Sequence, residues 1–263
     1  MNISGSTVLI TGATGGIGQA IARAMHARGG ELILTGRRTD VLEPLARELD
    51  ARAIAVDLSD AAEIERLVSE AGEVDILIAN AALPATGTLD DYTVEQIDRA
   101  LDVNLRAPIV LAHALAPGMV GRGRGQLVFI SSLAGKTASP GSALYNASKF
   151  GLRGFAGALR ADLRRSGVGV STVFPGFIRD AGMFADTGAT LPPGVGTRSP
   201  EDVARAVVGA IERNRGEVDV APLPLRAGTA FASLAPELAG NIQRRLGAER
   251  ISEMMVAAQR EKR

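Results

Sequence analysis

The feature that most constrains this chain is a glycine-rich turn between a short apolar run and a helical pattern. Residues 7–10 are β-branched and apolar, which predicts a buried strand, and a helical pattern continues from the turn to Ala27. Strand, glycine turn and helix in this order form the context that a dinucleotide-phosphate loop requires. The glycines let the backbone approach a pyrophosphate, and the helix N-terminus offers N–H groups. The residues expected to contact the cofactor here are Gly12, Thr14, Gly16, Ile17 and Gly18.

Strand-like runs alternate with helical patterns along the rest of the chain, at a spacing typical of βαβ units. We therefore predict an α/β fold, a Rossmann-type doubly wound parallel sheet of about seven strands with helices on both faces. Right-handed crossovers bring the carboxyl ends of the strands to one edge, where Asp57, Asn80 and Ser132 should lie beside the glycine turn. The other predicted strands are 31–35, 53–56, 74–78, 126–130, 168–174 and 217–221, and the other helices are 40–49, 60–71, 93–120, 142–166 and 199–214.

Composition excludes several classes of protein. The 263 residues are 46% hydrophobic, with 29 basic and 29 acidic side chains, which suits one soluble domain or at most two and gives no support to a nucleic-acid partner. There is no cysteine, and His26 and His113 each stand alone, so we expect neither disulfides nor a metal site. The N-terminus is uncharged up to Arg23 but is interrupted by glycines, unlike a signal peptide or a membrane span. We therefore expect a cytoplasmic protein.

Tyr145 and Lys149 are spaced to lie on one face of a helix, about 6 Å apart along its axis. A cation beside a phenol favours the phenolate, so this spacing predicts a lowered tyrosine pKa and proton transfer near neutral pH. Ser132 follows the predicted strand 126–130 and should converge on the same crevice. Alone, however, the Tyr-x-x-x-Lys spacing also arises by chance on helices with a solvated edge or a packed ring.

Arg37 and Arg38 follow the second predicted strand, where the adenine ribose of a dinucleotide should lie. An acidic residue there would hydrogen-bond a free 2′-hydroxyl, whereas two guanidiniums suit a 2′-phosphate. The pair therefore favours NADP(H) over NAD(H). The alternative is that both arginines cap the following helix or face water.

Three residues in the long predicted helices allow expectations of their own. Asn104 lies within the 93–120 pattern, where Pro108 and Pro117 should bend or end the helix, and an asparagine in a helix faces solvent by default. Gly154 and Gly157 within the later helix indicate close packing, either against the sheet or against another subunit.

With these motifs in place, the chain resembles the short-chain dehydrogenase/reductase family over residues 5–222. Thr11 to Gly18 matches the TGxxxGxG loop of that family, and Asn80 to Ala82 is similar to its NAG segment. Pro175-Gly176 matches its PG motif. The family's catalytic tetrad falls on Asn104, Ser132, Tyr145 and Lys149.

The resemblance implies roles for these residues. Tyr145 would be the general acid/base at the substrate oxygen, and Ser132 would hydrogen-bond that oxygen. Lys149 would lower the tyrosine pKa and bind the nicotinamide ribose, while Asn104 would hold a water in a proton relay. A homodimer or homotetramer through the two long helices is also implied. Besides Tyr145, Lys149 and the two arginines, the implied cofactor contacts are Asp57, Leu58, Asn80, Ala81, Ala82, Pro175, Gly176 and Ile178.

The chain departs from the family pattern at two positions. Asp180 stands where the family often has a threonine that contacts the nicotinamide carboxamide, and its carboxylate could accept that bond or pair with Arg179. Gly15 stands where NADP-dependent members often carry a basic residue, so Arg37 and Arg38 would have to recognise the phosphate.

Beyond the last motif, two segments remain. The largely apolar stretch 177–198 reads as a lid over the crevice and predicts a substrate with apolar surface, unless its apolar residues simply pack on the protein. Residues 1–222 should form the nucleotide-binding domain, and residues 223–263 a helical extension packed on it. Because both charge signs mix on the extension, subunit or substrate-side packing is favoured over membrane contact.

Together these observations predict an NADP(H)-dependent oxidoreductase that interconverts an alcohol and a ketone or aldehyde. Two alternatives stay open: a family member that acts as a dehydratase or epimerase, and a non-catalytic NADP-binding regulator or scaffold.

Overall fold

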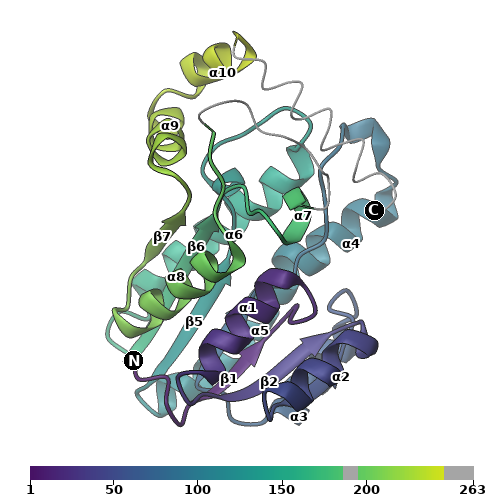
Figure 1. Cartoon of the computed structure of the whole chain (residues 1–263), viewed down its shortest axis with the longest axis vertical. Coiled ribbons are helices and arrows are strands. Elements are labelled where there is room, and N and C mark those ends of the chain that lie inside the picture. The colour runs from purple at the N-terminus through teal and green to yellow at the C-terminus, as the bar shows by residue number, and fades with distance from the viewer. Residues whose placement is uncertain (186–194, 246–263) are drawn as a thin grey trace.

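The computed structural model describes residues 1–185 and 195–245, and within these ranges one sheet of seven strands organises the chain (Figure 1). Every strand pairing is parallel, and the strand order is β3-β2-β1-β4-β5-β6-β7. The predicted doubly wound α/β fold is therefore confirmed. The strands are β1 (Thr7–Ile10), β2 (Glu31–Gly36), β3 (Arg52–Ala55), β4 (Ile76–Ala79), β5 (Gly125–Ile130), β6 (Val168–Pro175) and β7 (Glu217–Val220).

The central strands are apolar runs because helices bury them from both sides. Leu9 of β1 pairs with Ile33 of β2 on one side and with Leu77 of β4 on the other, and all three side chains are buried. From β1 the chain builds the sheet outward to β3, then returns to add β4 on the opposite side. This reversal of strand order is the switch point at which ligands bind in open α/β sheets.

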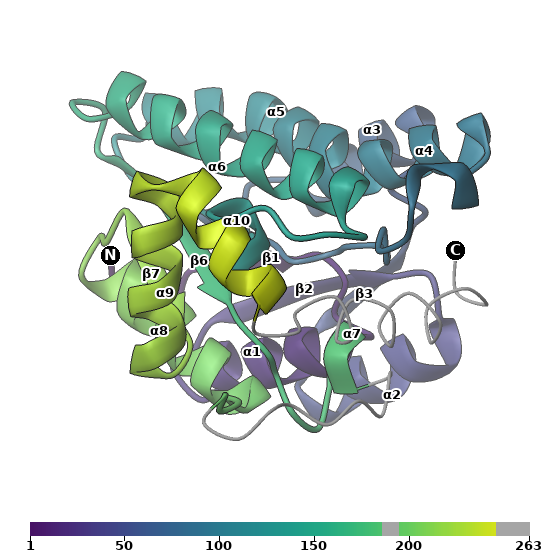
Figure 2. The same cartoon turned by 90° about the horizontal axis from the view of Figure 1, so that it is seen from above.

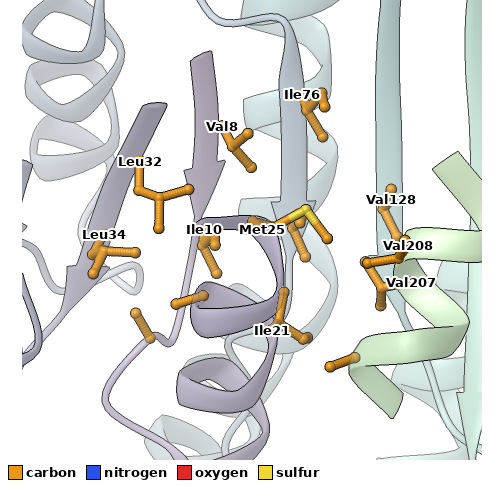
Figure 3. Close-up of a cluster of buried hydrophobic side chains, with 14 of the residues drawn as sticks. Val8, Ile10, Ile21, Met25, Leu32, Leu34, Ile76, Val128, Val207 and Val208 are labelled. Carbon is orange, nitrogen blue, oxygen red and sulfur yellow. The ribbon is translucent and has the colours of Figure 1, made fainter. Parts of the chain in front are cut away.

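Helices cover both faces of the sheet (Figure 2), and a layer of buried hydrophobic side chains lies between the helices and each face. Helices α1 (Gly16–His26), α2 (Thr39–Glu48) and α8 (Pro200–Glu212) contribute to one layer, and α3 (Ala61–Ala71), α5 (Ala107–Gly121) and α6 (Ala143–Asp162) to the other. Alternate residues of each strand point to opposite layers, since Val8 and Ile10 pack with Met25 of α1 while Leu9 packs on the far side. Figure 3 shows the first layer between these strands and α1 and α8.

The predicted start of α8 is confirmed in detail. Ser199 accepts a hydrogen bond from the backbone N–H of Asp202, and Asp202 accepts from the N–H of Ser199 in return. Pro200 occupies the first helical turn, where its missing N–H costs no hydrogen bond. This capping box fixes the start of α8 at the end of the segment that follows β6.

Several element boundaries differ from the predictions. The pattern over 93–120 is three consecutive helical segments, α4 (Val94–Leu101), a π-helical turn η2 (Asp102–Arg106) and α5. Pro108 lies in the first turn of α5, and Pro117 lies inside α5 without ending it. Helix α6 ends at Asp162 rather than at residue 166. Among the described residues, Val94–Gly121 is the one helical run long and apolar enough to span a bilayer, although 44% of its most apolar stretch is buried inside the protein.

Beyond β7, helices α9 (Leu223–Leu234) and α10 (Pro236–Arg245) extend past the carboxyl edge of the sheet (Figure 1). Ser233 of α9 donates to the backbone carbonyl of Lys136, 3.0 Å away, which ties α9 to the loop after β5. The remainder of the predicted extension, 246–263, lies outside the described residues. The division of the chain at residue 222 stays a prediction.

Candidate active site

The glycine-rich turn after β1 is braced by the end of β4. The Thr11 hydroxyl accepts hydrogen bonds from the backbone N–H groups of Asn80 and Ala81, at 3.0 and 3.1 Å. The Asn80 amide donates to the carbonyls of Thr11 and Gly12, at 3.0 and 3.1 Å. The Asn80 side chain is therefore turned toward the loop that it supports. Its neighbours Ala81 and Ala82, which the family resemblance also assigns to the cofactor, lie at the same switch point.

The turn itself requires glycine at two positions. Gly12 has a φ of +66°, and a Cβ there would lie 2.7 Å from the Ala81 Cα. At Gly18 a Cβ would lie 2.2 Å from the Gly12 carbonyl oxygen, so no side chain fits. Gly15 precedes α1 as its N-cap, and the first turn of α1 has neither a side-chain cap nor an acidic residue. The leading N–H groups, on Gly16, Ile17 and Gly18, are thus suited to an anion such as a pyrophosphate.

The two arginines after β2 flank this turn. Arg38 donates to the Thr14 carbonyl at 2.6 Å, which holds its guanidinium beside the glycine loop. Arg37 is exposed, with Nη1 3.8 Å from Asp57 Oδ2. Gly36 lets the end of β2 approach the glycine turn closely, because a Cβ there would lie 2.7 Å from the Thr14 Cγ2. The guanidiniums therefore border the position predicted for the adenine ribose, and neither acts only as a helix cap.

Asp57, at the end of β3, is already engaged by neighbouring donors. Its Oδ1 accepts from the N–H and the hydroxyl of Ser59, at 3.0 and 2.7 Å, and its Oδ2 accepts from Arg99 at 3.0 Å. Burial works to raise the pKa of Asp57, but the Ser59 hydrogen bonds and the charges of Arg99 and Arg37 outweigh it and hold the pKa below its ordinary value. Leu58, next in the chain, is buried.

Ser132 lies two residues beyond the end of β5, as predicted. Its hydroxyl accepts from the N–H of Ala134 at 3.1 Å and donates to the Pro175 carbonyl at 3.4 Å. It also hydrogen-bonds the Tyr145 phenol. Gly176 follows Pro175, and its N–H donates to the Val220 carbonyl at 3.0 Å. A Cβ at Gly176 would lie 3.2 Å from the Leu133 Cδ1, so the glycine leaves room for this leucine. The ends of β5 and β6 and the start of α6 thus meet at the serine.

Lys149 is the most deeply buried charged group at this site. It is 2% exposed, and its ammonium donates to the Ile130 carbonyl at 3.0 Å, 5.7 Å from the Tyr145 ring centre. Burial lowers the pKa of Lys149 to about 8. The backbone carbonyl of Lys149 in turn accepts from Ser131 at 3.1 Å, so the lysine is fixed from both ends.

The expectation that the pKa of Tyr145 lies below its ordinary value is wrong for this arrangement. Burial of the phenol raises the pKa of Tyr145 above its ordinary value, and the Ser132 hydrogen bond offsets this only in part. The Lys149 ammonium is hydrogen-bonded to the Ile130 carbonyl at the end of β5. Tyr145 keeps part of its surface exposed, yet desolvation is the largest influence on this pKa.

Asn104 is fully buried, so the expectation that it faces solvent is also wrong. Its amide donates to the Leu83 carbonyl at 3.0 Å and its Oδ1 accepts from the Leu83 N–H at 2.6 Å, which anchors the segment after β4. Asn104 lies in the π-helical turn η2, and Pro108, four residues later, has no N–H to donate to the Asn104 carbonyl. The missing donor explains why the regular helix is interrupted here.

Comparison with known proteins settles the family. The sequence model of the short chain dehydrogenase family matches residues 6–191 of this chain. The chain is 36% identical over 232 residues to ketoacyl reductase HetN of a Nostoc species, covering 85% of this chain and 81% of HetN. The chain belongs to the short-chain dehydrogenase/reductase family. It is also 34% identical over 258 residues to dehydrogenase/reductase SDR family member 7B of Xenopus laevis, covering 90% of this chain and 80% of the relative.

Solved structures of short-chain dehydrogenases share the fold of this chain. One from Sphingobium yanoikuyae, in complex with NADPH, superposes with a TM-score of 0.77 at 28% identity, over 90% of this chain and 95% of that one. As a short-chain dehydrogenase/reductase, the protein is an NAD(P)-dependent oxidoreductase that acts on CH–OH groups. Family membership also implies a nicotinamide cofactor and a small-molecule substrate.

Asn146 supports the site in a way that the sequence motif did not reveal. Its amide donates to the carbonyls of Ala134 and Thr137, at 2.6 and 2.9 Å, and its Oδ1 accepts from the Ser139 N–H at 3.3 Å. These bonds hold the loop that follows Ser132. The only signal in the sequence was an asparagine adjacent to Tyr145 inside a short-chain dehydrogenase motif, and asparagine is a poor helix former without such a partner.

The segment predicted to form a lid follows β6 and lies beside the start of α1. Ile178 is buried and pairs with Arg198 across the base of the segment, and helix α7 (Gly182–Ala185) lies beside the start of α1 (Figures 1 and 2). A Cβ at Gly16 would lie 2.4 Å from the Ala181 side chain. Asp180 pairs with Arg179 at 3.3 Å, the second of the two roles foreseen for it. Residues 186–194, with Asp186 and the apolar Leu191, Pro192 and Pro193, lie outside the described residues.

The buried Lys149 ammonium should make the stability of the nucleotide-free protein depend on pH. The pKa falls from 10.5 to about 8 on folding, so between these values the unfolded chain binds more protons than the folded protein. The free energy of unfolding therefore rises with pH across this window. From pH 8 to 10 we expect a rise of about 2 kcal/mol in the wild type that is absent in Lys149→Met. Urea denaturation measures both, and equal pH slopes would contradict the buried ammonium.

Proposed function

We propose that this enzyme is an NADP(H)-dependent oxidoreductase that interconverts an alcohol and a ketone or aldehyde, with Tyr145 as the general acid/base. The observation that carries the proposal is the meeting of Ser132, Tyr145 and Lys149 at the carboxyl edge of the sheet. The glycine turn of β1 lies on the same edge, at the switch point between β1 and β4. A phenol at this place can exchange a proton with a substrate oxygen next to a bound dinucleotide.

The role proposed for each residue follows from its position in the site. The nicotinamide, when bound, supplies or accepts the hydride. Ser132 already hydrogen-bonds the phenol and would share the substrate oxygen with it, so it fixes the angle of approach. Lys149 carries a buried positive charge that stabilises the phenolate form of Tyr145 when the proton leaves. The Asn104 side chain is committed to Leu83, so within a proton relay it would act through its backbone.

The preference for NADP(H) rests on Arg37 and Arg38. No acidic residue follows β2 directly, and Arg38 is held against the glycine turn by the Thr14 carbonyl. Two guanidiniums at this place recognise a 2′-phosphate by charge and by paired hydrogen bonds. The Sphingobium yanoikuyae relative, described in complex with NADPH, supports the same preference.

Apolar side chains around Tyr145 indicate the kind of substrate. Leu144 and Ala85 are buried beside it, with Tyr92 and Ile97 packed against them. On the lid side, the rings of Phe177 and Phe184 pack against each other, 5.0 Å apart. Walls of this kind suit a carbonyl compound with an apolar chain. Since HetN and a Rickettsia conorii relative are named as ketoacyl and 3-oxoacyl-[acyl-carrier-protein] reductases, 3-oxoacyl thioesters are the first substrates to test.

Tyr145→Phe should separate an enzyme from a cofactor-binding regulator. Removing the hydroxyl abolishes proton transfer but leaves the ring in its packing, so we expect kcat to fall about 10³-fold while NADPH binding changes less than about threefold. Turnover is followed at the nicotinamide absorbance with a panel of ketones, aldehydes and alcohols. A variant that keeps most of its turnover would rule out Tyr145 as the acid/base. A wild type that binds NADPH but turns over no member of the panel would favour the regulator.

The cofactor preference is measured by titrating the protein with NADPH and NADH and following the fluorescence of the reduced nicotinamide. We expect NADPH to bind at least about tenfold more tightly than NADH, and Arg37→Ala to remove most of that difference by weakening NADPH alone. As a control, Arg47→Ala removes an exposed arginine at the far end of α2. Arg47 contacts neither Thr14 nor Asp57. Tighter binding of NADH by the wild type would contradict the assignment.

A homo-oligomer through α5 and α6 is part of the proposal. Gly154 and Gly157 are exposed, and a Cβ at either position would meet no atom within 4 Å, so packing against the sheet does not explain them. Another subunit is the remaining alternative. Size-exclusion chromatography with light scattering should show a dimer or tetramer that Gly154→Arg dissociates and Gly228→Arg, on the exposed side of α9, does not. A monomeric wild type would contradict this interface.

A further inference from the structure

Two arginines from different parts of the chain converge on Asp57 at the end of β3. Arg37 approaches from β2, with its Nη1 3.8 Å from Asp57 Oδ2. Arg99 approaches from α4, and its Nη2 lies 3.0 Å from the same oxygen. The contact with Arg99 is the shorter one and has hydrogen-bond geometry, whereas the contact with Arg37 is an ion pair without a hydrogen bond.

Arg99 is held at this edge by the way in which α4 is built. Thr93 caps the helix in a reciprocal pair with Gln96, which fixes where α4 begins. Ala100, next to Arg99, is buried in the small apolar cluster beside Tyr145. The guanidinium therefore projects from a fixed helix toward the end of β3, and both Arg99 and Asp57 keep access to solvent at the rim.

Asp57 poses an electrostatic problem for a cofactor that carries a 2′-phosphate. Its pKa is held low, so it is ionised at neutral pH. An ionised carboxylate near the adenine ribose repels a phosphate dianion and attracts Arg37, the residue that would bind that phosphate. Without compensation, Asp57 would therefore disfavour NADP(H) relative to NAD(H).

We infer that Arg99 is a positioning residue for NADP(H): it neutralises Asp57 and leaves Arg37 available to the 2′-phosphate. This inference rests on the proposed preference for NADP(H). It adds Arg99 to Arg37 and Arg38 as a third charged residue on which that preference depends. In this arrangement Arg99 acts through Asp57 and does not touch the phosphate. Its effect should therefore appear only with a cofactor that has the phosphate, and only while Asp57 is charged.

The first test compares cofactor affinities of Arg99→Ala and Arg99→Lys by fluorescence titration with NADPH and NADH. For Arg99→Ala we expect NADPH to bind about tenfold more weakly and NADH to stay within about twofold of the wild type. Arg99→Lys keeps the charge and should stay within about threefold for both. Arg47→Ala serves as the matched control, since it removes one exposed arginine that contacts no part of the site.

The second test repeats the substitution in an Asp57→Asn background. Because the asparagine side chain carries no charge to neutralise, Arg99→Ala should then weaken NADPH binding less than about twofold. A tenfold loss in both backgrounds would overturn the inference and show that Arg99 meets the phosphate directly. Equal losses for NADPH and NADH would also overturn it, since they indicate a general defect of the site.

The outcomes separate this inference from the proposed function. If the wild type itself does not prefer NADPH, the cofactor assignment fails and the inference fails with it. If the wild type prefers NADPH and Arg37→Ala removes the preference while Arg99→Ala does not, only the role of Arg99 is overturned. Circular dichroism and thermal unfolding of each variant confirm that affinity, and not folding, has changed.

Discussion

All seven strands of the described sheet run in the same direction, and this constraint places every component of the site. Parallel pairing brings the carboxyl ends of β1, β4, β5 and β6 to one edge, so residues far apart in sequence meet there. Thr11 and Gly12 join Asn80 and Ala81 through four hydrogen bonds across the switch point. The Ser132 hydroxyl reaches the Pro175 carbonyl between β5 and β6. The site residues are therefore attached to strand ends that the hydrophobic layers on both faces of the sheet hold in place.

Two electrostatic regimes operate along this edge. At the end proposed for the adenine ribose, Asp57, Arg37 and Arg99 are partly exposed, so their interactions are screened and should tune affinity more than stability. At the end proposed for the nicotinamide, Lys149 is buried and Tyr145 is partly buried, and desolvation moves both pKa values toward the neutral forms. Burial therefore favours the protonated phenol, which is the form that can donate a proton to a carbonyl oxygen.

The sequence predicts most of the fold because periodicity and glycine spacing are local signals. The strand ends, the glycine turn, the Ser199 cap and the placement of Ser132 follow from such patterns. What it does not predict depends on contacts between distant segments. Asn104 is buried because it binds Leu83 and because Pro108 interrupts the helix, and the pairing of Arg99 with Asp57 spans 42 residues. Likewise, the direction of the Tyr145 pKa depends on burial, which helix spacing does not encode.

The pKa of Tyr145, measured with and without bound NADP⁺, tests proton transfer at this edge most directly. The chain has two tyrosines and no tryptophan, so in a Tyr92→Phe variant the phenolate absorbance reports on Tyr145 alone. Without nucleotide the pKa should lie above its ordinary value of about 10. With NADP⁺ bound, the positive charges of the nicotinamide and of the Lys149 ammonium should lower the pKa of Tyr145 below its ordinary value. A pKa that stays above about 10 in the complex would contradict Tyr145 as the acid/base.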